Sequence, residues 1–322
     1  MSGDHRTRSS TGRTLAVVPP GAGAAAMSCG IVSVALHLAD FETFSRLWFA
    51  VGVAVWLLLV VVFVGRLTGD RARWIDEADT PPALTGVAAT SVLGTRCALL
   101  GWEPVAVVAL VITVAAWIVL MPAVIRHWVS PTVGVHFLLC VATQAIAVLG
   151  ATVAAAATAW WLATAALAMF GLGLGFYVAV LVRFSFAQLR VGAGDHWVFA
   201  GGLAISALAA GKLAAAAVVV EWPSVLHRSL QVVAVVIIGI SLACYAVLVV
   251  CEIRWPRVRY DVRRWSTAFP MGMTSAAALT DAAAAGAAWL RPVGAVLVWP
   301  AVILCAILLV ASVRHVQSAA RA

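Results

Sequence analysis

Long apolar segments recur along the whole chain and constrain its fold more than any other feature. An α-helix needs roughly 20 apolar residues to cross a bilayer, whereas a membrane barrel shows strands of about 10 residues with alternating polarity. The sequence therefore predicts an all-α integral membrane protein. The ten candidate spans are 21–39, 46–65, 84–101, 104–125, 132–156, 160–183, 196–220, 228–251, 268–289 and 292–313.

The composition excludes an ordinary soluble domain. Hydrophobic residues make up 64% of the 322 residues and charged residues only 11%, against about 25% charged residues in a soluble domain. No soluble domain fits between the candidate spans. We therefore expect a cytoplasmic N-terminal tail (1–20), a ten-helix transmembrane domain (21–313) and a cytoplasmic C-terminal tail (314–322).

The basic residues predict the orientation. With a cytoplasmic N-terminus, 16 arginines fall on the inner side and four on the outer side, as the positive-inside rule requires. We expect a multi-pass protein of the plasma or inner membrane with both termini in the cytoplasm, and the net charge of +8 needs no nucleic-acid partner. The outer four, which could concentrate anions or anchor helix ends, are Arg46, Arg96, Arg228 and Arg291.

The predicted helices alternate between two compositions. Breakers and loop lengths divide the chain into five helical hairpins. In 18-residue windows of the odd spans, 51 of 90 residues are Ala, Gly, Ser or Thr, against 26 of 90 in the even spans. Small residues let helices approach closely or leave a lumen open. We therefore predict an inner ring of five odd helices around a pore, with the even helices facing lipid or neighbouring subunits. The sixth span departs from this with Gly171, Gly173 and Gly175, which suggest close packing or a kink.

The ninth span has an unusual entrance. Arginines crowd its approach, and Phe269 then stands alone before a long run of small residues. We expect Pro270 in the first turn of this helix, where its missing N–H costs nothing. Phe269 is therefore a candidate pore gate. An ordinary core phenylalanine is the alternative.

Several other residues are candidates for contact with a solute. Lys212, the single lysine of the chain, lies in the seventh span, and Asp281 lies at a similar depth in the ninth. An isolated charge in hydrocarbon is expensive, so Lys212 forms an anion site, pairs with Asp281 or extends its ammonium group to the membrane interface. His136 has a proton-coupling role or a packing role. The candidate pore-lining or anion-binding residues are Gly30, Thr90, His136, Thr143, Ser206, Lys212, Gly272 and Thr280.

Two motifs in these spans resemble a known family. Met27 to Ser33 resembles the first-helix signature of the tellurite-resistance/dicarboxylate transporter family, and Trp265 to Pro270 resembles its ninth-helix signature, an aromatic residue followed by Phe-Pro. This family includes the plant guard-cell slow anion channels. The resemblance implies a homotrimer in which each protomer has its own five-helix pore for anions or organic acid anions, with Phe269 as the residue that blocks the pore.

The sequence leaves two transport functions open. One is passive or gated conduction of an inorganic or dicarboxylate anion. The other is proton-coupled export of a dicarboxylate or of a tellurite-type oxyanion. An enzyme is disfavoured because the sequence shows neither metal-ligand spacing nor a nucleophile paired with a base. We accordingly expect no cofactor and no metal site, with a small anion and the lipid bilayer as partners.

Overall fold

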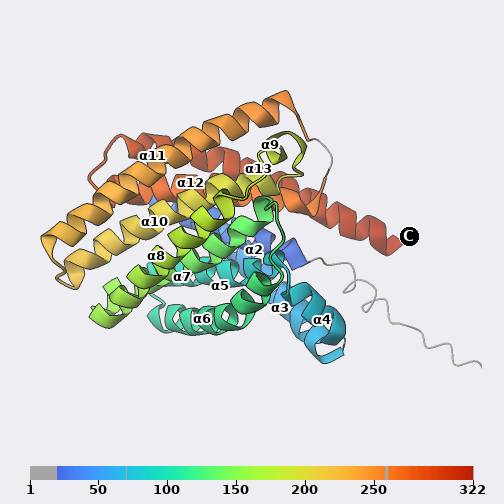
Figure 1. Cartoon of the computed structure of the whole chain (residues 1–322), viewed down its shortest axis with the longest axis horizontal. Helices are drawn as coiled ribbons and strands as arrows, with labels where there is room; N and C mark the ends of the chain where they lie inside the picture. Colours follow the sequence, from blue (N-terminus) through green and yellow to red (C-terminus); the bar gives the residue numbers. More distant parts are fainter. Residues whose placement is uncertain (1–19, 70, 258–259, 322) are drawn as a thin grey trace, which may run out of the picture.

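The computed structural model of the chain describes residues 20–69, 71–257 and 260–321 (Figure 1). Apart from Pro20, the predicted N-terminal tail lies outside these residues. Each predicted span corresponds to one long helix, and within the described residues the only β pairing is an isolated bridge between Thr132 and Phe184, which confirms the all-α class. The long helices are α2 (Gly23–Leu38), α3 (Glu42–Gly69), α5 (Leu84–Leu99), α6 (Glu103–Arg126), α7 (Leu138–Ala157), α8 (Trp160–Leu181), α10 (Val198–Val219), α11 (Ser224–Arg254), α12 (Trp265–Ala284) and α13 (Leu290–Arg321).

Shorter helices lie in the connections. Two of them, α4 (Arg71–Ala78) and α9 (Gln188–Val191), were not predicted. In Figure 1 they lie toward the same end of the bundle as the start of α2 and the end of α13. Single 3-10 turns precede several long helices: η1 (Pro20–Ala22), η2 (Pro81–Ala83), η3 (Gly134–Phe137), η4 (Asp195–Trp197) and η5 (Val262–Arg264).

Consecutive long helices pack in pairs: α2 with α3, α5 with α6, α7 with α8, α10 with α11, and α12 with α13. The turn inside each pair contains one residue with a positive φ, a conformation that ends a helix and reverses the chain. These residues are Asp40 (67°), Gly101 (77°), Thr158 (50°), Glu221 (55°) and Gly286 (66°). The same turn chemistry is therefore used five times, although only two of the five residues are glycine.

Burial divides the long helices into two sets. In the apolar windows of α3, α6, α8, α11 and α13, only 22–28% of residues are buried, whereas the windows of α7 and α10 are 94% and 78% buried. Nearly every residue of α2, α5 and α12 is buried as well. We call α2, α5, α7, α10 and α12 the inner helices and the other five the outer helices. The inner helices are the odd-numbered predicted spans, which are rich in small residues.

The inner helices contact one another in a closed cycle. α2 packs against α5, α5 against α7, α7 against α10, α10 against α12, and α12 against α2. Their small side chains permit these approaches. A Cβ on Gly201 of α10 would lie 2.8 Å from Cγ of Pro270 on α12, and a Cβ on Gly94 of α5 would lie 3.0 Å from Cδ2 of Leu149 on α7.

Seven of the described helical segments are long and apolar enough to cross a membrane: α3, α6, α7 with η3, α8, α10 with η4, α11 and α13. The other three long helices are α2 and α5, with 16 residues each, and α12, with 20 residues. A helix of 16 residues is about 24 Å long, which is shorter than the hydrocarbon core of about 30 Å. The structure therefore supports a helical membrane protein, and ten spans stay a prediction.

Two predicted details are changed by the structure. α12 begins at Trp265, so Pro270 lies inside the helix and not in the first turn of a helix beginning at residue 268. The proline lacks the N–H that would bond to the carbonyl of Ser266, four residues earlier. In α8, only Gly173 serves close packing, because a Cβ there would lie 2.7 Å from Cδ of Gln144, whereas a Cβ on Gly171 or Gly175 would meet no atom within 4 Å.

Candidate functional site

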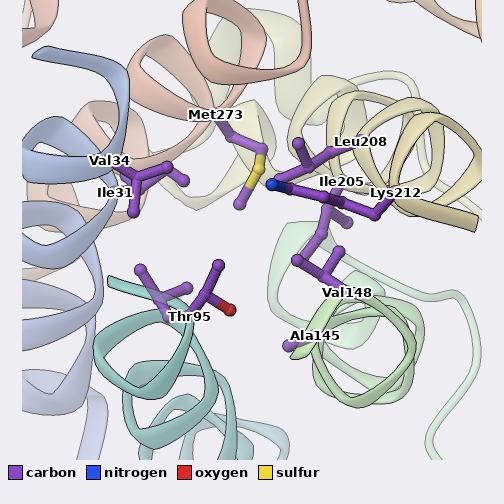
Figure 2. A pocket seen from close by; sticks show the side chains of 10 residues that line it. Ile31, Val34, Thr95, Ala145, Val148, Ile205, Leu208, Lys212 and Met273 are labelled. Carbon is purple, nitrogen blue, oxygen red and sulfur yellow. The ribbon is translucent and has the colours of Figure 1, made fainter. Parts of the chain in front are cut away.

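A small cavity lies at the centre of the inner helices (Figure 2). All five inner helices contribute to its lining, which is apolar except for Thr95 and Lys212. Its volume is about 10 Å³, enough for about one water molecule. The lining residues are Ile31 and Val34 of α2, Val92 and Thr95 of α5, Ala145 and Val148 of α7, Ile205, Leu208 and Lys212 of α10, and Met273 of α12.

Lys212 is the charged residue of this lining. Figure 2 shows its side chain extending from α10 with the nitrogen directed into the space that the labelled side chains surround. Thr95 is the second polar group, and its hydroxyl donates to the carbonyl of Ser91 at 2.9 Å. The ammonium group therefore faces a narrow space with apolar walls. A compact cation in such surroundings interacts strongly with any anion that enters.

The structure also bears on the alternative in which Lys212 pairs with Asp281. Asp281 of α12 is 0% exposed, and neither of its carboxylate oxygens has a hydrogen-bond partner among the described residues. A Cβ added to Gly211 of α10 would collide with Oδ1 of Asp281. The carboxylate thus lies beside the residue that precedes Lys212, but this conformation contains no ion pair between them.

Two of the predicted pore residues face the outer helices. The hydroxyl of Thr90 accepts a hydrogen bond of 2.9 Å from the indole of Trp56 on α3. Thr143 accepts an equivalent bond of 3.0 Å from Trp117 on α6. Each threonine thus satisfies the N–H of a tryptophan on a neighbouring helix, a structural role within the bundle.

Three other predicted residues lie between adjacent inner helices. A Cβ on Gly30 would lie 3.0 Å from Cγ1 of Val92 on α5, and a Cβ on Gly272 would lie 3.0 Å from Cγ2 of Ile31 on α2. Ser206 donates to the carbonyl of Gly202 at 2.7 Å, on its own helix. Small residues at these positions allow the helices to approach closely.

Two more predicted residues lie near the ends of inner helices. His136 is part of η3, and its Nδ1 lies 3.1 Å from the backbone nitrogen of Val133, which gives it a capping role. Thr280 lies beside the close approach of α10 and α12, with its Cγ2 within 3.2 Å of a Cβ built on Gly211. Of the eight candidates for lining or anion binding, Lys212 is the one that lines the central cavity.

Phe269 is 0% exposed and lies on α12 one turn before Met273. Residues four apart share one face of a helix, so Phe269 continues the face on which Met273 lines the cavity. It lies between the cavity and the N-terminal end of α12.

Side chains from three parts of the chain hold that end of α12. Ser28 of α2 donates to the carbonyl of Trp265 at 3.0 Å, and the indole of Trp265 donates to Ser312 of α13 at 3.1 Å. Thr267 donates to the carbonyl of Gly194 at 3.2 Å. The turn of helix that carries Phe269 is therefore fixed to two helices and one loop.

Charged residues order the approach to α12. Glu252, near the end of α11, forms ion pairs with Arg264 at 2.7 Å and with Arg257 at 3.1 Å. Asp261 accepts hydrogen bonds from the backbone and side chain of Arg263, and the side-chain bond lowers the pKa of Asp261. At least three of the arginines that crowd this segment are therefore neutralised by acidic partners.

Arg96 is not a residue of an exposed outer mouth. It is 0% exposed, its Nη2 donates to both carboxylate oxygens of Glu42 at 2.8 and 2.9 Å, and its Nε donates to Ser33 and Ser45. These contacts join α5 to α2 and α3. Arg46 and Arg291 are exposed and pair with Glu42 and Asp40, as expected of residues at helix ends.

Sequence reasoning missed most of the lining because it selected small and polar residues. The lining consists mainly of Ile, Val, Leu and Met, which fill the central space, whereas the small residues lie where two helices touch. The inner helices are rich in small residues, so the large apolar residues within them are the feature of the sequence that could have identified the cavity lining.

Comparison with known families gives one match. The family model described as voltage-dependent anion channel matches residues 17–313, which covers all five inner helices and most of the chain. A search of curated proteins found no match.

Proposed function

This chain belongs to the voltage-dependent anion channel family, and we propose that it conducts small anions through the centre of its five inner helices. Membership of the family supports movement of anions across a membrane. The path, the contact residue and the gate are proposals from the geometry of the chain.

The central cavity carries this proposal. All five inner helices contribute to it, and the single lysine of the chain faces into it. Conduction requires a site that attracts an ion and yet releases it. One ammonium group among apolar side chains meets both requirements, because it offers a single attractive charge without a cage of donors.

We propose that all ten long helices span the membrane as five hairpins. The short inner helices α2, α5 and α12 need not resemble lipid-facing helices, because their neighbours cover them on nearly every side. The five repeated turns with a positive φ support the same arrangement.

The direction of the inner helices also favours anions. An outer helix returns the chain between successive inner helices, so all five run the same way. Each helix carries about half a positive charge at its N-terminus. With cytoplasmic termini, as the arginine distribution indicates, five such ends face the cytoplasmic mouth.

We propose that Phe269 closes the path on the cytoplasmic side of the cavity. Its support is its position one turn before Met273, on the cavity-facing side of α12. The cavity has room for about one water molecule only, which supports a closed path in this conformation. Opening requires movement of side chains such as Phe269 and Met273 away from the centre.

The charge of the site favours a monovalent anion over a dicarboxylate. Lys212 is the one charged residue of the lining, and a dicarboxylate would leave its second charge facing apolar walls, which is costly. Proton-coupled export of a dicarboxylate or of a tellurite-type oxyanion therefore ranks second.

We further propose a homotrimer in the plasma or inner membrane. The outer face of α8 supports an interface, since Gly171 and Gly175 are exposed there and a Cβ on either would meet nothing within 4 Å. Small residues on an exposed face allow close contact with a helix of another subunit. The mass of the purified protein in detergent tests the stoichiometry, and a monomer would contradict it.

Purified protein in liposomes tests the conduction proposal. We expect chloride and nitrate flux without a pH gradient, and little malate flux. Lys212→Met should reduce the flux while the amount of folded protein stays nearly the same. Anion flux that requires a proton gradient, or malate flux above chloride flux, would favour coupled transport instead.

A further inference from the structure

Asp281 is a buried acid for which the described structure shows no partner. It is 0% exposed, and both of its carboxylate oxygens lack a hydrogen-bond partner. It also lies within one turn of the C-terminal end of α12, which ends at Ala284, where the helix dipole disfavours negative charge. Leaving a buried polar group unpaired is costly, so a partner in another conformation would stabilise the fold.

The position of Asp281 identifies such a partner. Its carboxylate lies against Gly211 so closely that a Cβ there would collide with it. Lys212 is the next residue, and consecutive Cα atoms are about 3.8 Å apart. Successive residues on a helix point in directions about 100° apart, which is why Lys212 faces the cavity and Gly211 faces Asp281. The flexible four-carbon stem of lysine spans this short interval.

The other basic groups near the C-terminal end of α12 are engaged elsewhere or exposed. His227 of α11 is within hydrogen-bond distance, 3.0 Å, of the carbonyl of Ala214. Arg291 of α13 pairs with Asp40, and His37 of α2 pairs with Glu42. Arg228 of α11 is exposed. Within the described residues, Lys212 is the cation whose attachment point adjoins the carboxylate.

We propose that Asp281 sets the anion affinity of the central site by competing with the anion for the ammonium group of Lys212. In the observed conformation the ammonium faces the cavity and is free to bind an anion. In the second conformation it turns to Asp281, and the cavity loses its positive charge. The two interpretations of Lys212 are thus two positions of one side chain. The inference rests on the proposed function, because it assigns a residue that tunes the same site.

The competition has a measurable consequence for affinity. Apparent affinity is reduced by the fraction of time that a site spends in its binding-competent state. If the ammonium faces the cavity for between a half and a tenth of the time, removal of Asp281 should lower the half-saturating chloride concentration about two- to tenfold. Asp281→Asn removes the charge with little change of shape. Thr280→Val is the control, since it alters the adjacent residue without removing a charge.

Chloride flux into liposomes gives the first readout. We expect Asp281→Asn to lower the half-saturating concentration and Thr280→Val to leave it unchanged. In a Lys212→Met background, Asp281→Asn should have no effect, because the ammonium for which it competes is absent. An equal shift in both backgrounds, or no shift in either, would overturn the proposal.

A second readout does not depend on transport. Because Lys212 is the single lysine, protein labelled with ¹³C at the lysine ε-carbon gives one NMR signal from this side chain. Asp281→Asn should change the chemical shift of this signal, and Thr280→Val should not. In the Asp281→Asn protein, chloride should change the shift at a lower concentration than in the unaltered protein. A signal unaffected by Asp281→Asn would refute the competition. A shifted signal in a protein that shows no anion flux would refute the proposed function and leave the Lys212–Asp281 contact standing.

Discussion

Replacement of Phe269 by alanine tests whether this residue is a pore gate or an ordinary core residue. The side chain is fully buried, so Phe269→Ala should lower the free energy of unfolding by about 3–5 kcal/mol, whichever role it has. Stability alone therefore does not distinguish the two roles. The distinguishing quantity is anion flux, because the vacated ring volume would join a cavity of about 10 Å³ on the proposed path.

Phe137 supplies a matched control. It is also 0% exposed, and its ring packs against Tyr177, Phe184 and Phe199 at centroid distances of 5.1, 5.3 and 5.7 Å. This cluster involves α8 and α10 and contributes nothing to the cavity lining. Phe137→Ala should cost a similar amount of stability without opening a path.

The assay is chloride flux per folded protein in liposomes, measured beside thermal unfolding in detergent. If removal of the Phe269 ring lowers the barrier to permeation by about 1.4–2.8 kcal/mol, flux should rise about 10- to 100-fold. Phe269→Leu should lie between. Equal loss of stability in both variants with no rise in flux for Phe269→Ala would show that Phe269 is core and that the path closes elsewhere.

Three further predictions follow from particular contacts. Arg96→Met should lower the free energy of unfolding by about 3 kcal/mol, since it breaks a buried ion pair. The loss should be at the low end for such a pair because Glu42 keeps Arg46 and His37 as partners. An unchanged melting temperature would contradict this. Gly173→Ala should lower the free energy of unfolding by about 1–3 kcal/mol, because its Cβ would collide with Gln144. Gly239→Ala should raise it by up to about 1 kcal/mol, because a Cβ there meets nothing within 4 Å. Equal melting temperatures for the two variants would refute the packing argument. In a background without native cysteines, Thr158→Cys should react with an impermeant thiol reagent from outside and Ala187→Cys only from inside, and the reverse pattern would invert the proposed orientation.

The helices and their two sets could be predicted from the sequence because each rests on local composition. A segment rich in Ala, Gly, Ser and Thr is too thin to face lipid well, and burial of α2, α5, α7, α10 and α12 has the same cause. The short helix α4 and the start of α12 were missed, since both depend on charged loop residues with no apolar periodicity. The position of Pro270 followed from that second error.

The candidate site was less predictable because side-chain direction depends on tertiary contacts. Thr90 and Thr143 are polar residues on thin helices, yet each turns to a tryptophan of an outer helix. Arg96 falls on the outer side of the chain by charge counting, yet Glu42 and two serines hold it inside the fold. Lys212 was a candidate from the sequence, because an isolated ammonium on a buried helix has few places to point, but the sequence left open whether it turns to the cavity or to Asp281.

The two sets of helices also explain where this chain tolerates charge at membrane depth. Within the described residues, the acidic and basic residues of the outer helices lie near helix ends, as with Glu103 and Arg126 of α6, because lipid surrounds the middle of those helices and a charge there is expensive. Lys212 lies about two turns before the end of α10, whereas Asp281 lies within one turn of the end of α12, and both belong to the inner set. The outer helices shield the inner helices from lipid, so the residues of the inner helices can be selected for packing between helices and for contact with a solute. In the observed conformation Lys212 forms no ion pair with Asp281, and a buried charge left unpaired costs stability; this cost supports the proposal that Lys212 is retained for anion binding and not for folding.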